Sequence, residues 1–156
     1  MDVMEMLNET KQHLNDVIDA IYAATVIGGL DMERDSIKAE FEAVALYVAG
    51  ADNDISSNEV DLFNYLFDFD IPIEDMPKVI PTLKEMYNNT VVQLQMPGWI
   101  TCKAIDKAEG TLDATEQYIQ TMSLVMTVFS IVDGEVAASE ERFIENFENR
   151  LRSNRF

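Results

Sequence analysis

Apolar residues recur along the chain at the spacing of an amphipathic helix. The first such run contains Leu7, Leu14, Val17, Ile18, Ile21 and Tyr22. Intervals of three and four residues place side chains on one face of an α-helix, so this run predicts a first helix of about 20 residues. Gly28-Gly29 marks its end, because glycine commonly follows the last helical turn.

The rest of the chain repeats this pattern between Pro and Gly breaks. Strand-type alternation bounded by hairpin turns is missing, and a chain of 156 residues suits one domain. We therefore expect an all-α domain over residues 1–156, a helical bundle of six to eight helices. The further helices are marked by apolar positions in 37–48, 60–67, 80–94, 119–129 and 143–151, with a short helix from Trp99 to about Ala108.

An internal repeat appears when the chain is shifted against itself by 81 residues. ADNDISSNEVDLF, residues 51–63, then lies over VDGEVAASEERFI, residues 132–144. The apolar segments before them, EAVALYVAGA and SLVMTVFSIV, align as well. The bundle is therefore expected to contain two pseudo-repeated helix–acidic loop–helix units, at about residues 36–70 and 116–152.

Both loops share the pattern D-x-[DE]-[IV]-x-x-x-E. This is the spacing of the second half of an EF-hand loop, which ends in a bidentate Glu. The first half is lost, since apolar residues or Gly replace its carboxylates, and each loop offers only two or three protein ligands. The pattern argues against tight calcium sensing and favours a weaker site for Ca²⁺, Mg²⁺ or Mn²⁺, with Kd on the order of 10⁻⁴–10⁻³ M. The candidate metal ligands are Asp52, Asp54, Glu59, Asp133, Glu135 and Glu140.

A second interpretation of the same loops needs no metal. Ser56-Ser57-Asn58-Glu59 reads as a capping box, in which Ser56 caps a helix and Glu59 reaches back to the cap. Carboxylates at a helix N-terminus are favourable by themselves. In the second loop Ala137 replaces the capping Ser while Glu140 is kept, which favours a role for this Glu beyond capping. Turn chemistry and a cation site both stay open at this point.

The two acidic units resemble the TerB-like family of tellurite-resistance proteins. The resemblance rests on AD-x-x-IS-x-x-E and VDGEV-x-x-x-E, each between an apolar and an amphipathic helix. It implies a small all-α fold and a divalent cation held by the six acidic loop residues. It also implies a part in bacterial stress responses to tellurite and other toxic agents, often within larger complexes near the membrane. Asn53 stands where the family usually has the Gly of ADG, which weakens the first site relative to the second.

The charge of −18 limits the partners of the protein. Ten carboxylates and no basic residue lie between Lys38 and Lys78, and such a field repels phosphate backbones and anionic lipid. Direct nucleic-acid binding and membrane insertion are therefore not expected. The charge supports an alternative function, an acidic interaction module without a metal site that binds a basic protein surface or mimics nucleic-acid charge. With no apolar run of about 18 residues and no signal-like N-terminus, a cytoplasmic location is expected.

No motif predicts an enzyme. The chain contains no Gly-rich phosphate loop, G-x-S-x-G, H-E-x-x-H or C-x-x-C. The single cysteine, Cys102, is expected to be a small buried hydrophobe. His13 lies near Glu9 and Asp16 at helical spacing, but this trio is expected on a solvated helix face. We therefore expect no catalytic residues and no cofactor besides a cation.

Overall fold

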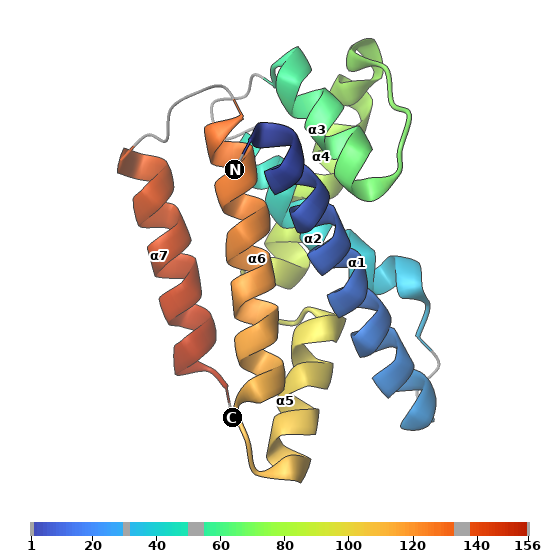
Figure 1. Ribbon diagram of the computed structural model, residues 1–156, viewed down its shortest axis with the longest axis vertical. Helices are drawn as coiled ribbons and strands as arrows, with labels where there is room; N and C mark the ends of the chain where they lie inside the picture. Colours follow the sequence, from blue (N-terminus) through green and yellow to red (C-terminus); the bar gives the residue numbers. More distant parts are fainter. Residues whose placement is uncertain (1, 30–31, 50–54, 133–137, 156) are drawn as a thin grey trace.

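The computed structural model describes residues 2–29, 32–49, 55–132 and 138–155, and within these ranges the secondary structure is entirely helical. The predicted all-α bundle of six to eight helices is confirmed, with seven α-helices in the described ranges (Figure 1). They are α1 (Val3–Ile27), α2 (Arg34–Ala49), α3 (Ser57–Phe67), α4 (Met76–Met86), α5 (Pro97–Glu109), α6 (Asp113–Ile131) and α7 (Ala138–Ser153), with a 3₁₀ turn at Ile73–Asp75 and a π turn at Tyr87–Val91.

Helix α6 is the centre of the bundle, as its apolar sequence predicts. It packs against α1, α2, α5 and α7, and Figure 1 shows it running between α7 and α5. Ile119, Met122, Val125 and Met126 have no exposed surface. A helix with apolar residues on most of its circumference is stable only where other helices cover it, so the position of α6 follows from its composition.

Local sequence signals set most helix ends. The Oδ1 of Asp2 accepts the backbone N–H of Glu5 at 2.8 Å, which caps the start of α1. Gly110 ends α5 with φ 70°, a left-handed conformation that glycine adopts without strain. Pro97 occupies the first turn of α5, where its missing N–H costs no helical hydrogen bond.

The start of α6 is capped from the preceding helix. Asp106 of α5 is fully buried and accepts the backbone N–H groups of Ala114 at 2.8 Å and Thr115 at 2.9 Å, and the hydroxyl of Thr115 at 2.6 Å. Burial alone would raise the pKa of Asp106, but these hydrogen bonds hold it below the usual value. One carboxylate thus fixes the turn between α5 and α6.

The segment after α4 departs from regular helix. The sequence predicts one helix over 80–94, but a π turn at Tyr87–Val91 follows α4 directly. The wider turn accompanies a stacked pair, in which the ring of Tyr87 lies 4.0 Å from that of Tyr47 on α2. Aromatic packing between these helices therefore coincides with the irregularity, which no spacing in the sequence indicates.

Candidate functional site

Four of the six predicted metal ligands lie outside the described residues: Asp52, Asp54, Asp133 and Glu135. The other two, Glu59 and Glu140, occupy equivalent positions. Each is the third residue of its helix, in α3 and α7, and the two helices begin 81 residues apart. The offset found in the sequence is thus also the offset between helix starts.

Glu59 forms the capping box that the sequence predicts. Its Oε1 accepts the backbone N–H of Ser56 at 3.0 Å, and the hydroxyl of Ser56 accepts the backbone N–H of Glu59 at 3.2 Å. The Glu59 side chain is buried, with an exposed fraction of 7% for the residue. Helix capping is therefore confirmed as one role of Glu59, and at least one of its oxygens is engaged there.

Glu140 lies in the first turn of α7 and is half-buried. Phe143, three residues later on the same helix face, packs against Tyr47 of α2 with ring centroids 5.1 Å apart. The helix after the second acidic loop thus contacts the last turns of the helix before the first one.

A surface pocket lies beside the flanks of both acidic segments. Val132, directly after α6, lines this pocket together with Asn58, Asp61 and Leu62 of the first turns of α3 and with Met4 and Leu7 of α1. In Figure 1 the end of α6 and the starts of α3 and α7 lie at the same upper end of the bundle. The described helix ends that flank the two acidic segments thus lie at one end of the bundle.

The described residues contain no group of three or more His, Cys, Asp and Glu side chains arranged to hold a metal ion. Four of the six candidate ligands fall outside those residues. Carboxylates are the oxygen ligands that Ca²⁺, Mg²⁺ and Mn²⁺ prefer, so the chemistry of the six side chains suits these cations.

Eight of the ten carboxylates between Lys38 and Lys78 belong to described residues, and three of these eight are buried. They are Glu40, Glu42 and Glu59. Glu40 lies on α2 at helical spacing from Ile37 and Val44, which are also fully buried, and this spacing is the signal that marks it as a core position. Part of the formal negative charge thus belongs to side chains in the interior of the bundle and not to its surface.

Glu40 is held in the core by neutral donors. The hydroxyl of Tyr118 on α6 donates to Oε1 at 2.6 Å, and the backbone N–H of Gly98 on α5 donates to Oε2 at 2.9 Å. Burial raises the pKa of Glu40 to about 7, although both hydrogen bonds lower it. Glu40 therefore joins three helices and changes its protonation near neutral pH.

Glu42, on another side of α2, is 8% exposed. Burial raises its pKa to about 7, while the ammonium of Lys38, 3.9 Å from Oε1, lowers it and the Asp35 carboxylate raises it. Two carboxyls of one helix thus share an elevated pKa for the same main reason, loss of water around the charged form.

The expectation of a solvated helix face is wrong for His13, one residue of the trio with Glu9 and Asp16. It is half-buried, and its Nε2 lies 3.0 Å from the hydroxyl of Thr121 on α6. Glu9 and Asp16 are exposed. The α1 face carrying His13 is covered by α6, an arrangement that depends on residues 108 positions apart.

Cys102 is buried as predicted, with 2% of its surface exposed. Burial raises the pKa of its thiol to about 12, and the Glu40 and Asp106 carboxylates raise it further. A thiol with this pKa remains protonated at neutral pH and is a poor nucleophile.

Comparison with known protein families, curated proteins and solved structures finds no match. None of the described helices is both long enough and apolar enough to cross a membrane. The resemblance to the TerB-like family therefore stays a prediction that rests on the repeated acidic motif.

Proposed function

We propose that this protein is a non-enzymatic, TerB-like adaptor whose two acidic loops together bind a divalent cation, Ca²⁺, Mg²⁺ or Mn²⁺. The observation that carries the proposal is the equivalence of Glu59 and Glu140 at the starts of α3 and α7, at one end of the bundle. Each loop alone offers two or three ligands, too few for a calcium site, which takes six to eight oxygens. Two loops that shared one ion would bring six carboxylates toward that number. A stress response of the tellurite type is the process that the family resemblance suggests.

The proposal predicts saturable binding confined to the loops. Backbone-amide NMR titration with CaCl₂, MgCl₂ and MnCl₂ should give shifts, or broadening with Mn²⁺, limited to residues 52–59 and 133–140. We expect a Kd below the range of low-affinity calcium modules, which is on the order of 10⁻⁴–10⁻³ M, because the two loops pool their carboxylates. The double variants Asp52→Asn/Glu59→Gln and Asp133→Asn/Glu140→Gln should each weaken binding at both loops, because the loops share one ion.

Two controls separate metal binding from helix capping. Glu59→Gln preserves the capping box, since Gln also serves at this position, so its effect reports on the carboxylate charge. Ser56→Ala removes the capping hydroxyl and leaves every carboxylate in place, and it should still bind the cation. Weak, diffuse shifts that both double variants leave unchanged would refute the cation site.

The net charge of −18 supports the alternative function, an acidic module that binds a basic protein surface. This alternative predicts association with an oligolysine peptide that weakens strongly as NaCl rises from 50 to 300 mM, a range over which surface charges become screened. The loop variants should bind like other variants that lose the same number of charges. Isothermal titration calorimetry at several salt concentrations checks this, and salt-independent or absent binding would contradict it.

A further inference from the structure

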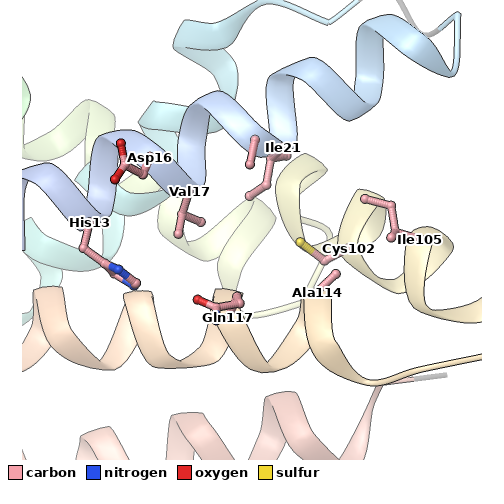
Figure 2. Close-up of a pocket in the computed structure, with 9 residues that line it drawn as sticks. His13, Asp16, Val17, Ile21, Cys102, Ile105, Ala114 and Gln117 are labelled. Carbon is pink, nitrogen blue, oxygen red and sulfur yellow. The ribbon is translucent and has the colours of Figure 1, made fainter. Parts of the chain in front are cut away.

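A pocket of about 370 Å³ opens between α1, α5 and α6 (Figure 2). Its size falls in the range of small-molecule sites, about 300–1,000 Å³. It is distant in the fold from the loop ends: Ala114 and Gln117 lie in the first turns of α6, whereas the second acidic loop follows its last turn. The apolar part of its wall consists of Val17, Ala20, Ile21, Cys102, Ile105 and Ala114.

The polar part of the wall is formed by His13, Asp16 and Gln117. Figure 2 shows His13 and Asp16 on α1 and Gln117 on the facing helix α6. The hydroxyl of Thr121 lies 2.7 Å from the backbone carbonyl oxygen of Gln117 and 3.0 Å from Nε2 of His13, so this ring nitrogen already has a hydrogen-bond partner on α6.

Hydrogen-bond acceptors outnumber donors among these groups. Asp16 is an exposed carboxylate whose Oδ1 accepts the side-chain amide of Gln12 at 2.9 Å. The Gln117 carboxamide contributes one acceptor oxygen and two donor protons. A positively charged ligand group that only donates hydrogen bonds matches these acceptors. A carboxylate group would be repelled by Asp16 and by the overall negative charge of the protein.

We propose that this pocket binds a primary alkylammonium compound, with its apolar chain against the wall formed by α1 and α5 and its ammonium group near Asp16. An ammonium group has three donors and no acceptor, and the wall buries several methylenes. The pocket and the helix ends that flank the acidic segments lie on different parts of the bundle. Binding here is therefore independent of the divalent-cation site.

The probe for this site is hexylammonium chloride, followed by ¹H–¹³C NMR of alanine methyl groups and ¹H–¹⁵N NMR of side-chain amides. Saturable shifts are expected at Ala20, Ala114 and the carboxamide of Gln117. Affinity should rise about fourfold per methylene from butylammonium to hexylammonium, as for methylenes leaving water. Hexanol and hexanoate, of matched length, should bind more weakly, because neither places a positive charge near Asp16.

Two variants and one control complete the test. Asp16→Asn should weaken hexylammonium binding about fivefold, the effect of one exposed ion pair. Ala20→Leu should weaken binding by narrowing the pocket, and circular dichroism should show an unchanged helix content. Asp70→Asn, which removes an equal charge from an exposed site outside the pocket, should bind like the wild type.

Three results would overturn the proposal. Hexanol or hexanoate binding as tightly as hexylammonium would remove the role of the positive charge. Shifts spread over the acidic surface without dependence on chain length would show ion pairing alone. Unchanged binding in either Asp16→Asn or a folded Ala20→Leu variant would place the ligand elsewhere. These readouts do not depend on whether the acidic loops respond to CaCl₂. The alkylammonium site and the divalent-cation site can therefore be refuted independently.

Discussion

Replacing Glu40 with Gln is expected to raise the free energy of unfolding by about 3 kcal/mol at pH 8 and by less than about 1 kcal/mol at pH 5. Glu40 is fully buried, and its pKa is raised from 4.5 to about 7. Above pH 7 the folded protein must hold a buried carboxylate that the unfolded chain exposes to water. Gln has a similar shape and carries no charge, so it removes this cost.

The sign follows from the direction of the pKa shift. A carboxyl whose pKa is higher in the folded state contributes stability that is fully present below 4.5 and is lost as the pH rises through about 7. The protonated form fits the site, because Oε1–H can donate to Tyr118, whose hydroxyl lies 3.4 Å from Sδ of Met96 and can donate there. The side-chain amide of Gln reproduces this arrangement.

Urea denaturation between pH 5 and pH 8 measures the effect. The wild type should lose stability over this range, and Glu40→Gln should remove about half of the loss. Glu42→Gln should remove most of the remainder, since its pKa is also about 7. Asp70→Asn controls for the removal of one negative charge and should keep the pH dependence of the wild type. A Glu40→Gln variant with that same dependence would show that Glu40 does not titrate in this range.

Gly98→Ala is expected to destabilise the protein by about 2–3 kcal/mol, the upper range for overpacking a core. A Cβ at this position would lie 2.4 Å from Oε1 and 3.1 Å from Cδ of Glu40. The carboxylate has little room to move, because Tyr118 and the Gly98 N–H both hold it. The clash therefore outweighs the higher helix propensity of Ala, about 1 kcal/mol.

A double-mutant cycle tests the cause of this loss. In a Glu40→Ala background the Gly98→Ala change should be neutral or slightly stabilising, because no carboxylate remains to meet the new methyl group. Chemical denaturation of the four proteins at pH 6 provides the comparison. If Gly98→Ala lowers the free energy of unfolding equally in both backgrounds, Gly98 is required for its backbone conformation. The close approach of the Glu40 side chain to Gly98 would then not be the cause.

Much of the fold could be predicted from local patterns. The apolar spacing in α6, the glycine after α5 and the Ser56–Glu59 capping box each depend on residues within a few turns, and the structure confirms all three. The π turn at Tyr87–Val91 and the cap that Asp106 places on α6 were not predicted. Both depend on contacts between residues of different helices, and the apolar periodicity within one helix does not reveal such contacts.

The candidate functional residues were likewise only partly predictable from the sequence. The repeat at an offset of 81 residues indicated equivalent positions for Glu59 and Glu140, and the helix starts agree. The pocket between α1, α5 and α6 gave no signal in the sequence, because its wall combines residues from three helices. His13 was assigned to the wrong environment for that reason, since a helical wheel of α1 does not show which neighbour covers its flank.

The sequence by itself determined the helical class, the acidic charge and the duplication of the helix–acidic loop–helix unit, since all three depend on residue type and short-range spacing. Only the tertiary structure decided which carboxylates lose their water. Glu40 and Asp70 are the same kind of group in the sequence, but Tyr118, 78 residues from Glu40, and the backbone of Gly98 enclose the former, while the latter is exposed. Burial raises the pKa and sets the pH dependence of stability, and burial is a property of packed helices.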